Sequence, residues 1–303
     1  MSLGDSSELQ PGVNIATAEK VRLSLCALDN VLAADCLGDD AATFLSGWEK
    51  AGAWLSIPTH WSTYMRDPVF ITAVQIRLGV PIIGAPRTCR CGAVGDVMGH
   101  HALMHCTTGL SRGAVTQRHT AVQDVLRSIQ LESVGLITQG PKGAQVAHHF
   151  GRKKPAGPDR LGDLIALRPT IASPEWPKII DLTIVAPIAS NSHVIPGASA
   201  AAAEERKFKH YMDQYHLPSS RNNIIPFAAE AGGFLGTHAV GWLQYLARTS
   251  GRESWEYSGK VRQYYERIAV VIQAMNVALI HKWLATGSSP LAGAGAGEAA
   301  ACG

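Results

Sequence analysis

The sequence predicts a mixed α/β domain in which a small sheet is flanked by helices. Segments of helical period alternate with short β-like runs over residues 116–286. The β-like runs are apolar and are separated by turns rich in Gly and Pro. The apolar content of 46% is enough to bury a core. The order helix, three strands, helix, strand, helix therefore predicts an α/β or α+β architecture.

The N-terminal part predicts a polar tail followed by helices. Residues 1–17 are polar and lack the apolar stretch of a signal peptide. Residues 18–86 predict a helical linker segment, because apolar residues recur at helical spacing over 18–37 and 41–53. Asp67-Pro68 predicts the start of a further helix, since Pro is favoured in a first turn.

The domain over residues 116–286 follows, with each element bounded by its periodicity and its turns. Helices are expected over residues 116–131, 198–215, 237–248 and 255–285, and strands over 134–138, 161–167, 178–185 and 224–229. A basic cluster, Arg152-Lys153-Lys154, lies in the expected loop between the first two strands. Residues 287–303 are rich in Gly, Ala and Ser and are expected to form a disordered tail.

Composition excludes some classes of protein and leaves others open. The formal net charge of +3 is too small to indicate a nucleic-acid partner by itself. Polar residues interrupt the most apolar stretch, 268–284, so no membrane span is expected. The six cysteines lack the spacing of a secreted disulfide framework, which favours a reducing, intracellular compartment.

Residues 87–115 predict a zinc knuckle, because they combine cysteines and histidines with no helical or strand period. The predicted ligands are Cys89, Cys91, His101 and Cys106. His100 and His105 are alternatives to His101. The other interpretation is a metal-free loop with buried thiols.

Two aspartates on neighbouring strands predict a second metal site. Asp163 begins one apolar run and Asp181 lies inside the next. A buried carboxylate is costly unless it is paired or binds a cation, and Mg²⁺ prefers carboxylate oxygens. Lys207 and Lys209 on the following helix are candidates for a nearby lysine. The alternative is that each aspartate caps a turn or marks a strand edge.

Short motifs in a fixed order add a resemblance to these patterns. The order is Trp54-Leu55, Arg77-Leu78-Gly79, Cys89-Arg90-Cys91-Gly92, Gly99-His100-His101, Cys106, Arg118-His119, Arg160 to Leu164, Asp181 to Pro187, Lys207 to Tyr211, and Pro226 to Gly233. In this order the chain resembles, over about residues 50–285, the C-terminal region of non-LTR retrotransposon proteins. In that family a Cys/His knuckle follows the reverse transcriptase, and a restriction-endonuclease-like nuclease of the PD-(D/E)xK type follows the knuckle.

The resemblance implies a restriction-endonuclease-like fold and a magnesium-dependent enzyme that nicks DNA. Asp163 and Asp181 would hold the metal, with Asp159 as an alternative first acid. Lys207 would be the catalytic lysine, displaced onto the helix because no lysine follows Asp181 at the usual short spacing. Glu230 would be an auxiliary acid or an ordinary turn acid.

The resemblance also implies partners and a location. DNA is the expected target, element RNA a further partner, and the nucleus the expected compartment. Arg118 and His119, together with the basic cluster, are expected to contact nucleic acid. Gln139 stands where an acid is expected before the first metal strand, which lowers the expected metal affinity.

Two interpretations other than a nuclease stay open: a remnant that binds nucleic acid without cutting it, and a purely structural remnant. The chain carries no Tyr-x-Asp-Asp polymerase turn, so it is not expected to be a reverse transcriptase by itself. It would then be a fragment, a decayed copy, or a nuclease remnant with another use. A remnant that binds nucleic acid without cutting it predicts salt-sensitive binding, whereas a purely structural remnant predicts none. Oligomeric state is left open.

Overall fold

The computed structural model describes residues 53–55, 64–78, 80–106, 109–134, 137–139, 151, 162–167, 177–185, 197–216, 223–250, 254–286 and 288–290. The elements in chain order are η1 (Ala53–Leu55), α4 (Asp67–Leu78), β1 (Arg87–Cys89), β2 (Val94–Gly95), η3 (His101–His105), α5 (Gly109–Val134), β3 (Ile137–Gln139), β4 (Leu164–Ala166), β5 (Lys178–Val185), α7 (Ala198–Gln214), β6 (Ile224–Glu230), α8 (Thr237–Ser250), α9 (Ser254–Thr286) and β7 (Ser288–Pro290). The helices expected over residues 18–37 and 41–53 lie outside the described residues, apart from Ala53 in η1.

The larger sheet has four strands in the order β3-β4-β5-β6. The pairs β3–β4 and β4–β5 are antiparallel, and β5–β6 is parallel. Two parallel neighbours need a crossover connection, and α7 provides it. The predicted mixed α/β architecture is thus confirmed at the level of a small mixed sheet with helices.

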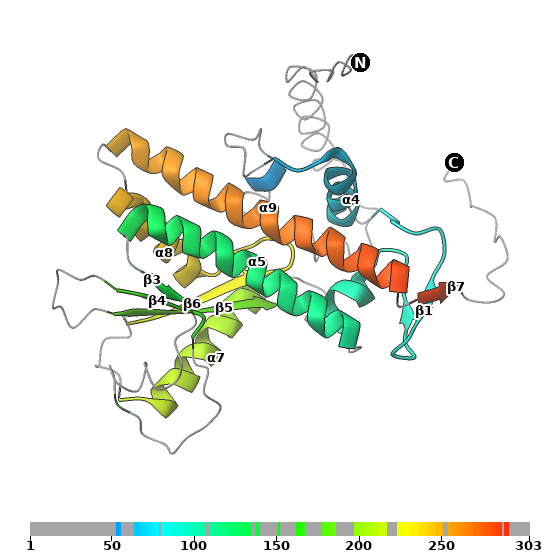
Figure 1. The fold of residues 1–303 in the computed structure, drawn as a ribbon, viewed down its shortest axis with the longest axis horizontal. Coiled ribbons are helices and arrows are strands. Elements are labelled where there is room, and N and C mark those ends of the chain that lie inside the picture. Colours follow the sequence, from blue (N-terminus) through cyan, green and yellow to red (C-terminus); the bar gives the residue numbers. More distant parts are fainter. Residues whose placement is uncertain are drawn as a thin grey trace, which may run out of the picture.

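Helices cover both faces of this sheet, as Figure 1 shows. Alternate residues of a strand point to opposite faces. Ile180 and Leu182 of β5 pack against α5, α8 and α9. Ile179 packs on the other face against Phe208 and Tyr211 of α7. Asp181 has the parity of Ile179, so it faces α7 from within the layer between sheet and helix.

A second core joins the Cys/His segment to the long helix α9. Cys89, Leu103, Ile280 and Trp283 are buried together in it. The small sheet of this region has the order β2-β1-β7, and β7 pairs with β1 antiparallel. Within the segment expected as a tail, Ser288–Pro290 forms a strand. The Cys/His segment packs against the last helix, α9.

Some element bounds also differ from the sequence-based expectation. Val134 was expected in a strand but ends α5, and α5 begins at Gly109 instead of near Thr116. The helical stretch therefore extends into the expected knuckle. Hydrophobic period defines the middle of a helix better than its ends, where residues without apolar contacts continue the backbone hydrogen bonds.

The helix α9 is long and apolar enough to cross a membrane by length and composition. A core helix of a globular protein passes the same test, and 56% of the most apolar window of α9 is buried. Figure 1 shows α9 running beside α5 above the sheet, and the two helices share the main core.

Glu204 of α7 is a buried acid with a structural task at the start of α8. Its carboxylate accepts the backbone N–H groups of His238 at 3.1 Å and Ala239 at 3.2 Å. The first N–H groups of a helix have no partner inside the helix, so a carboxylate there stabilises it. Burial raises the pKa of Glu204, and these hydrogen bonds act against the rise.

We expect Glu204→Ala to lower the free energy of unfolding by about 1–3 kcal/mol, because it leaves buried N–H groups without an acceptor. Urea denaturation measures this change. The exposed neighbour Glu205 is the matched control, and Glu205→Ala should stay within about 0.5 kcal/mol of wild type. Equal effects of the two substitutions would contradict the capping role.

Candidate active site and metal centre

The two predicted aspartates lie opposite each other on neighbouring strands. Leu164 of β4 pairs with Ile180 of β5, which places Asp163 next to Asp181 in the same register. The Asp163 N–H continues the ladder by donating to the Ile180 carbonyl at 2.8 Å. Residues directly opposite in an antiparallel pair are close neighbours. The two aspartates are therefore neighbours, but Asp163 turns its side chain toward α5, whereas Asp181 turns its side chain toward α7.

Lys207 of α7 joins this acidic pair. Its Nζ lies 2.9 Å from both Oδ1 and Oδ2 of Asp181. Lys209, the other candidate lysine, is exposed. Asp181 is only 7% exposed, and its burial raises its pKa while the Lys207 charge opposes the rise. Among the residues that the structure describes, Lys207 is thus the cation that holds the buried carboxylate at its sheet position.

Asp163 is held from the opposite side of the sheet. Its Oδ2 accepts the backbone N–H of Leu182 at 2.7 Å and lies 3.2 Å from Nε2 of His119 on α5. The same Nε2 lies 3.2 Å from the carbonyl oxygen of Leu182. His119 was expected to contact nucleic acid, and the structure instead places its imidazole against the first acid of the site.

The contact between His119 and Asp163 predicts an observable titration in the metal-free protein. The hydrogen bond to Asp163 raises the pKa of His119 above 6.5, against the opposing effect of burial. A raised folded-state pKa adds stability that is complete below pH 6.5 and is lost as the pH rises through the folded value. We expect NMR titration to show His119 above 6.5 and Asp163→Asn to lower it. An unchanged value in Asp163→Asn would contradict the pairing.

Two side chains of this site were missed by the sequence reasoning. Gln123, one turn after His119 on α5, donates from Nε2 to the Asp163 carbonyl at 2.8 Å. Tyr211, one turn after Lys207 on α7, is fully buried, and its burial together with the negative charge of nearby Asp181 raises the pKa of its hydroxyl. The i,i+4 spacing of each pair was visible in the sequence. What the sequence lacked was the sheet position that each helix face meets.

Two expected site residues have other tasks. Glu230 ends β6, is 2% exposed, and accepts the Ala200 N–H at 3.4 Å in the first turn of α7. Arg118 is 4% exposed and donates to Oδ1 of Asn276 in α9 at 2.8 Å. Glu230 thus contacts the start of α7, which is closer to the alternative of an ordinary turn acid. Arg118 was expected to contact nucleic acid, and the structure instead buries it against Asn276.

Other predicted positions lie outside the described residues. These are the basic cluster Arg152-Lys153-Lys154, the alternative acid Asp159, and the side chains of Gln139 and His105.

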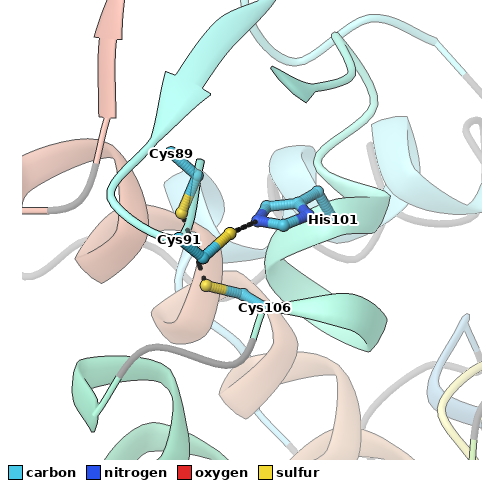
Figure 2. Close-up of side chains that lie close together, drawn as sticks. All are labelled: Cys89, Cys91, His101 and Cys106. Atoms are coloured by element: carbon cyan, nitrogen blue, oxygen red, sulfur yellow. Dashed lines mark hydrogen bonds between the residues drawn. The ribbon is translucent and has the colours of Figure 1, made fainter. Parts of the chain in front are cut away.

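The second site is the Cys/His cluster, whose four side chains point toward one another in Figure 2. One ligand atom from each of Cys89, Cys91, His101 and Cys106 lies within 4.8 Å of the others. Sγ of Cys89 is 3.4 Å from Sγ of Cys106, and Sγ of Cys91 is 3.3 Å from Nε2 of His101. This Cys₃His set could hold a metal ion.

A tight turn brings the first two cysteines to the same side. Cys89 ends β1, its N–H donates to the Ala93 carbonyl, and its carbonyl accepts the Gly92 N–H. Gly92 has a φ of 88°, in the left-handed region that favours glycine. Burial raises the pKa of the Cys89 thiol, so a cation is needed to favour its ligating thiolate form.

Asp96 fixes the histidine side of the cluster. Its Oδ2 accepts the backbone N–H of His101 at 3.0 Å, and its Oδ1 accepts those of Met98 and His100. Burial would raise the pKa of Asp96, but the N–H groups of His101 and His100 outweigh it and hold the pKa below its usual value. His100 turns its Nδ1 to Asp96 at 3.7 Å, which leaves His101 as the cluster histidine.

Comparison of the chain with protein-family models, with curated proteins and with solved structures found no match.

Proposed function

We propose that this protein is a magnesium-dependent DNA endonuclease of the restriction-endonuclease-like kind, which nicks DNA. The observation that carries the proposal is the pairing of Asp163 with Asp181 across neighbouring strands, together with the contact of Lys207 with Asp181. These residue types in this arrangement are the acids and the lysine that the resemblance to non-LTR retrotransposon nucleases implies. The mixed sheet with helices on both faces supports the same assignment.

The donor set at this place suits a hard divalent cation. Mg²⁺ commonly binds proteins through one or two carboxylates and keeps its remaining ligands as water or phosphate. Oδ2 of Asp163 is engaged by Leu182 and His119, whereas Oδ1 accepts no hydrogen bond from the described residues. Asp181 is buried, and in the described part of the chain its ion-pair partner is Lys207. Bound there, the metal would activate water and stabilise negative charge on the scissile phosphate.

The chain's own residues supply the rest of the site. Lys207 is 32% exposed, so its ammonium group reaches solvent while it contacts Asp181 and can face a bound phosphate. His119 is 31% exposed beside Asp163 and adds a second donor to the same surface. The two helices thus place positive and hydrogen-bonding groups around two carboxylates, which suits a phosphodiester substrate.

The Cys/His cluster is proposed to hold a structural zinc ion. Thiolate and imidazole are the ligands that zinc prefers, and a closed set of four protein ligands is typical of structural zinc sites. The site at Asp163 and Asp181 offers carboxylates, whereas the Cys/His cluster offers thiolates and an imidazole, so the two metals would be sorted by ligand chemistry.

DNA is the proposed partner, and element RNA a further one. The basic cluster Arg152-Lys153-Lys154 is the proposed phosphate contact, and the nucleus the proposed location.

Supercoiled plasmid tests the function directly. Purified protein with Mg²⁺ should convert the plasmid to open circles, and an excess of chelator should stop the conversion. Salt-sensitive plasmid binding without nicking would overturn the enzyme and support a binding remnant. Neither binding nor nicking would support a structural remnant.

A further inference from the structure

We infer that Tyr211 and Gln123 are positioning residues that fix the two carboxylates of the nuclease site from opposite faces of the sheet. The inference rests on the proposed function and names the side chains that hold its metal acids in place. Neither residue is expected to touch the substrate.

Each aspartate faces a pair of side chains that lie one turn apart on the same helix. On α5, His119 contacts the side chain of Asp163 and Gln123 holds its main-chain carbonyl at 2.8 Å. On α7, Lys207 contacts both oxygens of Asp181, and Tyr211 lies one turn further along the same helix face. Because α5 and α7 cover opposite faces of the sheet, the two acids are held from two directions.

Tyr211 is the buried member of its pair. The residue is fully buried, and its hydroxyl interacts with Asp181 without forming a hydrogen bond of ordinary geometry within the described residues. A buried hydroxyl with no good partner costs free energy, so a stability role alone does not account for it.

Gly162 leaves the space through which Tyr211 reaches the acids. Its φ is 81°, and an added Cβ would lie 3.3 Å from the Tyr211 hydroxyl and against Ile179. Glycine at this position therefore serves both the left-handed backbone that leads into Asp163 and the close approach of the hydroxyl.

Lys207 and Tyr211 have different roles because Lys207 is charged and Tyr211 is neutral. Among the described residues, Lys207 and Tyr211 are the side-chain donors directed at Asp181. If Lys207 turns its ammonium group toward a bound phosphate, Tyr211 stays as the donor that orients Asp181. Partners of this kind, which orient ligating carboxylates, contribute about 10- to 100-fold to metal affinity or activity.

Manganese binding tests the inference without relying on catalysis. Mn²⁺ is titrated into zinc-saturated protein and followed by electron paramagnetic resonance, with Asp181→Asn as the variant that identifies the site. We expect Tyr211→Phe and Gln123→Leu to weaken Mn²⁺ binding about tenfold each. Tyr215→Phe, which removes a hydroxyl from the ring stacked on Tyr211 at 6.0 Å, should bind Mn²⁺ like wild type.

The outcomes separate the inference from the function. Loss of Mn²⁺ affinity in Tyr211→Phe at an unchanged melting temperature supports positioning. Wild-type affinity in both Tyr211→Phe and Gln123→Leu overturns the inference and leaves the proposed function standing. Absence of Asp181-dependent Mn²⁺ binding in the wild type overturns the proposed function, and the inference with it. Gln123 is only partly buried, so Gln123→Leu keeps the test valid if Tyr211→Phe does not fold.

Discussion

Asp181→Ala is expected to abolish nicking of supercoiled plasmid, with the rate falling at least about 100-fold at saturating Mg²⁺. The substitution removes one of two carboxylates and leaves Lys207 without its partner. Because Lys207 is partly exposed, its charge can be solvated, and the fold should survive. Gel analysis of plasmid topology over time, together with a thermal melt, separates lost chemistry from lost structure.

The matched control is an aspartate on α7, the helix that carries Lys207. Asp213 of α7 is exposed and far along the helix from Lys207, so Asp213→Ala should nick at the wild-type rate. Plasmid nicking by Asp181→Ala at the wild-type rate would place the chemistry elsewhere, or in a contaminating nuclease. The variant Asp181→Asn, which keeps the side-chain shape, should behave like Asp181→Ala.

Removal of the metal from the Cys/His cluster is expected to cause the largest loss of stability. The purified protein should contain one zinc ion per chain, measured by elemental analysis. Folding free energy in such sites comes largely from metal binding, so chelation or Cys106→Ser should lower the melting temperature by roughly 10 °C or more. The effect should spread beyond the knuckle, because Cys89 shares a core with Ile280 and Trp283 of α9.

A cysteine outside the cluster provides the control for this experiment. Cys302→Ser should keep the zinc content and the melting temperature of wild type. A protein that is purified without zinc, gains none on reconstitution, and melts alike with and without chelator would contradict the structural metal. The interpretation as a metal-free loop with buried thiols would then hold.

Sequence periodicity predicted the elements of the main sheet with useful accuracy. The expected strand 178–185 matches β5, and the expected helices over 198–215, 237–248 and 255–285 match α7, α8 and α9 to within two residues at each end. These segments have long apolar patterns whose period decides between helix and strand. The short strand β7 was missed, because three residues, Ser-Ser-Pro, carry no pattern and are a strand only through pairing with β1.

Some residues of the candidate sites could likewise be predicted from the sequence, and others could not. Cys89, Cys91, His101 and Cys106 were predicted as a set, since thiols and imidazoles so close in the chain have few other uses. The roles of Glu230 and Arg118 were not decided by the sequence, because a charged residue has the same appearance there whether it contacts the start of a helix, bonds to Asn276, or faces solvent. Burial decides between those roles, and burial depends on which elements pack together.

The sequence by itself determined the alternation of helices and strands over residues 116–286, the three cysteines and candidate histidines of the Cys/His cluster, and the pair of acids in apolar strands. Only the tertiary structure decided that Lys207, and not Lys209, reaches Asp181, and that His119 and Gln123 hold Asp163. The physical reason is the distance along the chain between the residues that interact. Helical and strand periods are set by neighbours a few residues away, whereas the partners of a buried carboxylate come from segments 19 to 44 residues distant along the chain.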